Sequence, residues 1–228
     1  VAVLSNLERT PPLHPPSPKS NGIITVPFRL QDGGISSSPV VTQGTSITIR
    51  QEVNTMSRVR KQFRQVLAGD RAILAANIFD SLSARIAEML NYEVCVLSGS
   101  VGKATNLAVP DQVIANSSDL ADHCHRITRA ADVSLMVDAE DGFGNAVNAM
   151  RTVKELEAAG VSGIEIEDNS VPRSFGVREA GLVSKEEQVG KLRSAVAARS
   201  DPTTVIIART SALGLCPLDE ALDRIKAY

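Results

Sequence analysis

The sequence alternates between short apolar runs and amphipathic stretches, and this alternation is the strongest constraint on the fold. Apolar residues spaced three and four apart, typical of helices, follow each run. Strands that alternate with helices form a parallel sheet, so the predicted fold class is α/β. The five strands are predicted at 72–76, 93–97, 134–137, 163–168 and 204–208.

Each predicted helix has a recognisable start, end or apolar face. Gly160 is expected just past the end of one helix, and Ser184 with Glu187 forms a capping box at the start of the next. The buried face of the helix over 81–90 is expected to consist of Leu82, Ile86, Met89 and Leu90. The helices are predicted at 56–69, 81–90, 118–130, 146–159, 185–199 and 218–228.

Polar residues gather where the predicted strands end. A βα barrel builds its active site on that face, whereas a doubly wound sheet uses it only near a switch point in strand order. Polar ends on all five strands therefore favour a (β/α)8 TIM-barrel type fold, expected to be truncated after its fifth βα unit. These residues are Asp80, Ser98, Ser100, Asp138, Glu140, Glu167, Asp168 and Arg209.

Residues 1–55 differ in composition from the predicted catalytic domain, a partial βα barrel at 56–228. They contain seven of the 11 prolines, and such a segment buries too little surface to offset its ordering entropy. We expect a low-complexity, disordered extension, within which 45–49 alternates and could pair locally as a strand. The few acids are compatible with an organelle transit peptide, but the segment is not Arg-rich. The expected location is the cytoplasm, with organelle targeting left open.

Charge and cysteine content exclude several classes of partner. A formal charge of -2 gives no reason to expect nucleic acid or an anionic membrane, and no apolar run approaches the length of a membrane span. The 3 cysteines show no metal spacing and are expected to be reduced. His123-Cys124-His125 suggests a metal clip or, as we prefer, surface residues.

The segment 137–145 has three acids within four residues at the end of an apolar run: Asp138, Glu140 and Asp141. Acids at the end of a buried strand need compensation, commonly a hard cation such as Mg²⁺. Alternatively, Asp138 and Glu140 cap the helix that begins at Ala146. Asp141 is expected to be a turn residue.

Three segments resemble motifs of the phosphoenolpyruvate mutase and isocitrate lyase superfamily. They are Phe79-Asp80-Ser81-Leu82-Ser83-Ala84-Arg85, Asp138-Ala139-Glu140-Asp141-Gly142-Phe143-Gly144-Asn145 and Ile206-Ile207-Ala208-Arg209-Thr210-Ser211-Ala212. The resemblance runs from about Met56 to Tyr228, with order and spacing in agreement.

Within this superfamily the sequence is most similar to the oxaloacetate decarboxylase branch, through 97–101, 149–153 and 166–176. The isocitrate and methylisocitrate lyases carry a Lys-Lys-Cys-Gly loop, whereas 169–176 contains no Lys or Cys. The sequence also departs from the family pattern. Glu140 stands where the family has Asp, Asp141 where it has His or Thr, and Ser211 where it has Asn.

The resemblance implies a Mg²⁺ site, with Mn²⁺ as a substitute. Asp138 would anchor the metal, Glu167 would hold a metal-bound water, and Glu140 would take either role. Mg²⁺ usually takes one or two carboxylates and keeps several waters, so direct ligation by all three acids is not expected.

The resemblance also implies substrate contacts. Arg209 would grip a substrate carboxylate bidentately, or form a structural ion pair with Glu167 or Asp168. The segment of Ser98, Gly99 and Ser100 would hold the carboxylate of a 2-oxo acid, or be an ordinary tight turn. Asp111 would act on the substrate from a mobile loop, or be only a turn acid. The catalytic candidates are thus Arg209 and Asp111.

The implied activity is that of a carboxy-lyase that converts oxaloacetate, or a related small 2-oxo acid, to pyruvate and CO₂ through a metal-stabilised enolate. No organic cofactor is needed, and a homo-oligomer is expected, the family-typical tetramer if full length. Rival hypotheses are a carbon–carbon lyase for a 2-alkylmalate and a phosphonate mutase that uses Arg173 and Arg178. A further rival is a catalytically inactive fragment.

Overall fold

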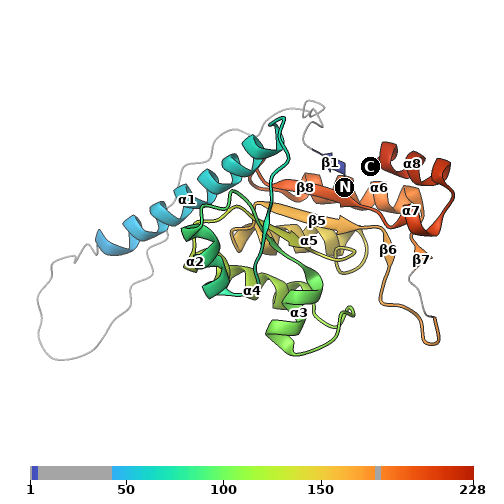
Figure 1. The fold of residues 1–228 in the computed structure, drawn as a ribbon, viewed down its shortest axis with the longest axis horizontal. Coiled ribbons are helices and arrows are strands. Elements are labelled where there is room, and N and C mark those ends of the chain that lie inside the picture. Colours follow the sequence, from blue (N-terminus) through green and yellow to red (C-terminus); the bar gives the residue numbers. More distant parts are fainter. Residues whose placement is uncertain (1, 5–42, 178–180) are drawn as a thin grey trace, which may run out of the picture.

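The computed structural model describes the backbone of residues 2–4, 43–177 and 181–228, with side chains from residue 55 onward within these ranges. A six-stranded sheet forms its centre (Figure 1). From one edge to the other its strands are β1 (Ala2–Leu4), β8 (Val205–Arg209), β5 (Gly163–Glu167), β4 (Leu135–Asp138), β3 (Cys95–Leu97) and β2 (Ala76–Asn77).

The order and direction of the strands are those of consecutive barrel units. The strands β2, β3, β4, β5 and β8 are parallel and lie in chain order, so the sheet has no switch point. β1 pairs antiparallel with β8. This arrangement confirms the predicted α/β fold of barrel type rather than a doubly wound sheet.

The helices of the units cover one face of the sheet and build the main core there. Buried residues of these helices pack against Leu135, Ile164, Ile166 and Ile206 of the strands. The helices that contribute to this core are α2 (Ser81–Met89), α4 (Ser117–Ala130), α5 (Ala146–Ala158), α6 (Lys185–Ala198) and α8 (Leu218–Ala227), the last through the adjoining Tyr228.

The helix α1 (Gln43–Leu67) packs against the opposite face of the sheet. Its Phe63 is 2% exposed and forms a smaller core with Val205 and Ile207 of β8. Gly163, the first residue of β5, makes room for this ring, because a Cβ atom there would lie 2.5 Å from Cε1 of Phe63. α1 therefore fills the start of this face and leaves the strand ends for a site.

The N-terminal segment differs from the prediction where the structure describes it. α1 begins at Gln43, so residues 45–49 are helical and the prediction of a local strand there is wrong. The helix α1 also covers residues 43–55 of the extension predicted to be disordered, whereas residues 5–42 lie outside the described part of the chain. The apolar residues of 59–67 continue a helix that begins in polar sequence, and the sequence pattern showed only the continuation.

Elements between the predicted units also differ. The segment after β3, for which no helix was predicted, forms the helix α3 (Gly99–Leu107). The long loop before α6 contains a two-stranded hairpin, β6 (Asn169–Ser170) and β7 (Gly181–Leu182), and α7 (Ala212–Leu215) follows β8. These elements are short or lack an apolar face, so periodicity did not reveal them.

Two predictions of burial are wrong. The buried face of α2 consists of Ala84 and Ala87, while the expected face is exposed. Small alanines let α2 approach α4 closely, which the larger side chains would prevent. His123 and Cys124 are buried rather than at the surface, and Nε2 of His123 lies 2.8 Å from the carbonyl oxygen of Phe79. The exposed residues of α2 are Leu82, Ile86, Met89 and Leu90. No described helix is both long and apolar enough to cross a membrane.

The contact between Phe63 and Gly163 gives a test of this packing. The variant Gly163→Ala forces a Cβ atom into the Phe63 ring, and overpacking of this kind lowers the free energy of unfolding by about 1–3 kcal/mol. Denaturant unfolding measures the change. In a Phe63→Leu background, Gly163→Ala should lower the free energy of unfolding by less than it does in the unmodified chain.

Gly190→Ala is the matched control, because Gly190 lies inside α6 and a Cβ atom there meets nothing within 4 Å. It should raise the unfolding free energy by roughly 0.5–1 kcal/mol. Equal effects of the two substitutions would contradict the packing described.

Candidate active site

The end of β3 approaches the end of β4 through a glycine. Ser98 caps α3, and its Oγ accepts a hydrogen bond from the amide of Val101 at 3.4 Å. The next amide, that of Gly99, donates to Oδ2 of Asp138 at 3.4 Å. A Cβ atom on Gly99 would lie 2.8 Å from Oε1 of Glu140 and 3.1 Å from Oδ2 of Asp138. Only glycine therefore allows both carboxylates to lie this close to α3.

The backbone after β4 turns sharply and separates the three acids. Oδ1 of Asp138 accepts a hydrogen bond from the amide of Glu140 at 2.9 Å, and Glu140 has a φ of 53°. Asp141 accepts from the amide of Phe143 at 2.9 Å, which makes it the expected turn residue. The helix α5 is capped by Asn145, so the alternative that Asp138 and Glu140 cap it is wrong.

Two glutamates of β5 point to the same face as Asp138. Residues of a strand alternate between faces, so Glu165 and Glu167 share the face opposite to Ile164 and Ile166. Asp138 is the register partner of Glu165, and Arg209 is that of Glu167. Both glutamates are buried.

Arg209 lies at the centre of these acids. Its Nη1 is 3.2 Å from Oδ2 of Asp138, 3.1 Å from Oε1 of Glu165 and 3.5 Å from Oε2 of Glu167. The same nitrogen makes all three contacts, and the side chain is 40% exposed. Within the described part of the chain, the other terminal nitrogen is thus left for a ligand.

Asp168 belongs to a different cluster. Its Oδ2 accepts hydrogen bonds from Oγ1 of Thr210 at 2.7 Å and from the hydroxyl of Tyr228 at 2.8 Å. The alternative of an ion pair between Arg209 and Asp168 is therefore wrong, whereas the pair with Glu167 is present.

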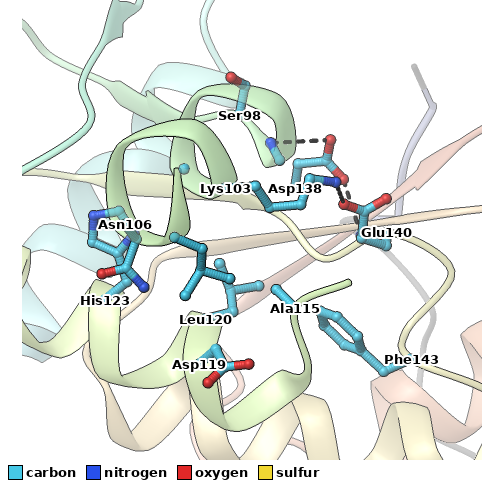
Figure 2. A pocket seen from close by; sticks show the side chains of 13 residues that line it. Ser98, Lys103, Asn106, Ala115, Asp119, Leu120, His123, Asp138, Glu140 and Phe143 are labelled. Carbon is cyan, nitrogen blue, oxygen red and sulfur yellow. Dashed lines mark hydrogen bonds and ion pairs between the residues drawn. The ribbon is translucent and has the colours of Figure 1, made fainter. Parts of the chain in front are cut away.

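Lys103 of α3 brings a second cation to the site. Its side chain is 6% exposed and reaches Glu140, as Figure 2 shows. Its Nζ also lies 3.0 Å from Oδ1 of Asp111, which sits in the loop between α3 and α4 and is 67% exposed.

The strand ends, α3 and the loops enclose a cavity of about 320 Å³. Lys103 also lines a smaller cavity of about 30 Å³ with residues of α3 and α4 (Figure 2). Five of the predicted site residues line the larger cavity, namely Asp111, Asp138, Glu140, Glu167 and Arg209. Ser98 and Gly99 line the smaller cavity, and Ser100 is exposed outside both.

Negative charge is in excess at the strand ends. Burial, followed by repulsion from neighbouring acids, raises the pKa of Glu140 and Glu165 above the ordinary 4.5, and burial together with Asp138 and Glu165 raises that of Glu167. Burial disfavours the charge of Lys103, but hydrogen bonds to Glu140 and Asp111 outweigh it and raise the pKa of the lysine. Five carboxylates thus face the two cationic side chains: Asp111 and Glu140 contact Lys103, and Asp138, Glu165 and Glu167 contact Arg209.

The donor set is chemically suited to a hard cation. Asp138 and Glu167 offer carboxylate oxygens on one cavity wall, which is the number and type of protein ligand that Mg²⁺ takes. Their negative charge is only partly matched by Arg209. Among the described residues, no group of three or more Asp, Glu, His or Cys side chains is arranged to hold a metal ion.

Glu165 and Lys103 are site residues that the sequence reasoning missed. The alternation Gly163-Ile164-Glu165-Ile166-Glu167 already placed Glu165 on the face of Glu167. Lys103 gave no such signal, because no helix was predicted for its segment. In a helix it lies one turn after Gly99 and on the same face.

Comparisons with known proteins agree with this geometry. The family model for phosphoenolpyruvate phosphomutase matches residues 63–228. The chain belongs to this family, the phosphoenolpyruvate mutase and isocitrate lyase superfamily, as the motifs predicted.

Curated relatives include the oxaloacetate decarboxylase of Rhodopseudomonas palustris (strain BisB18), 43% identical over 169 residues, which are 74% of this chain and 59% of the relative. The oxaloacetate decarboxylase of Pseudomonas fluorescens (strain SBW25) is 44% identical over 172 residues, with 75% and 59% covered. The chain therefore spans about three fifths of the length of these relatives.

Solved structures show the same fold. The phosphoenolpyruvate phosphomutase of Streptomyces platensis subsp. rosaceus matches with a TM-score of 0.69 and 32% identity, over 74% of this chain and 60% of that one. A phosphonopyruvate hydrolase in complex with oxalate and Mg²⁺ matches with a TM-score of 0.66 and 35% identity, over 75% and 59%.

The raised pKa of Glu165 predicts a pH dependence of stability. Its folded-state pKa is above 4.5, so the folded protein binds this proton more tightly than the unfolded chain does. The resulting stabilisation is fully present below pH 4.5 and is lost as the pH rises through the folded-state pKa. Melting temperatures between pH 4.5 and 8 should therefore decline less in Glu165→Gln than in the unmodified chain. Parallel profiles would show that Glu165 is not the group responsible.

Proposed function

We propose that the protein is a Mg²⁺-dependent carboxy-lyase that decarboxylates oxaloacetate, or a closely related 2-oxo acid, to pyruvate and CO₂. The observation that carries this proposal is the convergence of Asp138, Glu167 and Arg209 on one cavity at the strand ends. The names of the curated relatives support the same reaction. Mn²⁺ is the expected substitute for Mg²⁺.

The side chains would divide the work between metal and substrate. Asp138 and Glu167 would hold Mg²⁺, which supplies Lewis-acid polarisation of a 2-oxo group when bound. The outer terminal nitrogen of Arg209 would hold a substrate carboxylate by a charge-assisted hydrogen bond. The neighbouring acids fix the guanidinium in place, so little rotamer entropy is lost on binding.

The loop acid Asp111 and the end of β3 would complete the substrate site. Asp111 lies at the cavity wall, held by Lys103 but mostly exposed, so it would meet a ligand that enters. Gly99 would act through its small size, because it lets Asp138 lie close to α3. Ser98 would act as the cap that orients this turn.

A phosphonate reaction is the second candidate because Arg173 lines the same cavity. A cation there suits a phosphonate as well as a carboxylate. Arg178, the other predicted cation, lies outside the described residues. A 2-alkylmalate lyase and an inactive chain stay as further alternatives.

The compartment and self-association remain proposals. Cys95, Cys124 and Cys216 are unpaired thiols, which supports a reducing compartment such as the cytoplasm. The exposed apolar residues of α2 support a homo-oligomer.

Removal of the metal anchor gives the direct test. The full chain with Mg²⁺ should decarboxylate oxaloacetate, and Asp138→Asn should lower kcat/KM by about 100-fold, or ~2.7 kcal/mol of transition-state stabilisation. Asp223→Asn is the matched control, because Asp223 is an exposed partner of Lys185, and its activity should stay unchanged.

Substrate competition separates the candidates. Phosphonopyruvate and a 2-alkylmalate are assayed under the same conditions. Turnover of either in place of oxaloacetate would move the assignment to that reaction. Oxaloacetate consumption no faster than with Mg²⁺ alone would remove the decarboxylase proposal.

The close approach at Gly99 gives a second prediction. Gly99→Ala should displace the carboxylates of Asp138 and Glu140 and lower kcat/KM by about tenfold or more, since misplacement by about 1 Å is costly. Gly214→Ala, where a Cβ atom meets nothing within 4 Å, should have no such effect. Full activity of Gly99→Ala would show that this spacing is not needed.

A further inference from the structure

A buried lysine among acids is the feature of the site that the proposed reaction does not use. Lys103 is 6% exposed and lies against Glu140. A buried ammonium is costly unless it is paired, and here the pairing is supplied by Glu140 and by Asp111 at 3.0 Å.

The two cationic side chains of the site, Arg209 and Lys103, contact different acids. Arg209 contacts Asp138, Glu165 and Glu167. Glu140 pairs with Lys103 instead, since the left-handed backbone at Glu140 and the nearby helix α3 bring the two side chains together (Figure 2).

We propose that Lys103 is a built-in counter-ion that keeps Glu140 out of the metal ligand set, so that this chain binds a divalent cation through Asp138 and Glu167 with reduced affinity. This inference rests on the metal site of the proposed function. It assigns Lys103 the role of setting metal affinity rather than of contacting substrate.

The physical basis is competition for one carboxylate. An ammonium and a divalent cation that share Glu140 repel each other, and in a partly buried site this repulsion is only weakly screened. The ammonium group of Lys103 has little freedom to move away from Glu140, because the lysine belongs to α3 and its side chain is almost fully buried. Glu140 is therefore already neutralised before a metal arrives.

Titration of the full 228-residue chain with Mn²⁺ by isothermal calorimetry tests the proposal. Lys103→Met frees Glu140 and should increase Mn²⁺ affinity by about tenfold or more. Lys103→Met/Glu140→Gln removes both charges of the pair. The net charge of the site and its two metal ligands, Asp138 and Glu167, are then those of the unmodified chain, so the affinity should return to within about threefold of it.

Two further variants separate charge from packing. Lys103→Arg keeps the charge and should bind Mn²⁺ as the unmodified chain does. Lys185→Met removes a lysine that pairs with Asp223 outside the site, and should leave the affinity unchanged. Lys103→Gln replaces Lys103→Met if the methionine variant does not melt cooperatively.

The proposal is overturned if Mn²⁺ affinity in Lys103→Met is unchanged or weaker, or if the double variant loses affinity about tenfold. The second result would show that Glu140 is itself a ligand. Mn²⁺ binding is measured without substrate, so the role of Lys103 is tested even in a chain that fails to decarboxylate oxaloacetate. The proposal is supported if Lys103→Met binds Mn²⁺ tightly and the unmodified chain does not. It is contradicted if neither of these two forms binds Mn²⁺.

Discussion

The crowding of carboxylates at the ends of neighbouring strands is the constraint on which the site depends. Asp138, Glu165 and Glu167 are held within reach of one nitrogen of Arg209, and their repulsion would otherwise oppose folding. Gly99 permits the position of Asp138, because any side chain there would collide with Asp138 and with Glu140. Sheet register, a glycine and one arginine thus act as a single unit, and none of them explains the site alone.

The strand β5 shows how the same few residues serve both stability and chemistry. Ile164 and Ile166 face the helices and belong to the main core, while Glu165 and Glu167 face the cavity side. A one-residue shift in register would exchange these faces and place charges in the core. The apolar residues therefore fix the positions of the acids, and the helix layer is part of what orients the site.

Much of this arrangement was predictable from the sequence, since four of the five strands and the polar residues at the strand ends follow from short-range pattern. The strand predicted at 72–76 is misplaced, because the observed β2 is Ala76–Asn77. The pattern placed Asp138, Glu167 and Arg209 at strand ends, and the family resemblance supplied the roles predicted for them. The helix α3 was not predicted, because polar sequence with two glycines gives no amphipathic signal, and Lys103 was missed with it. The buried face of α2 was wrong for a related reason, since the choice between alanines and larger residues depends on how closely α4 packs. In both cases, the helix α3 and the buried face of α2, the outcome depends on tertiary contacts that local sequence does not show.

The antiparallel pairing of β1 with β8 has a topological consequence. Ala2, Val3 and Leu4 stand opposite Ala208, Ile207 and Ile206, and the other edge of β8 is occupied by β5. Both rows of backbone donors and acceptors along this part of β8 are therefore in use. Any additional strand, whether from this chain or from another molecule, reaches that edge only by exchange with β1. The strand β1 thus covers this edge of the sheet.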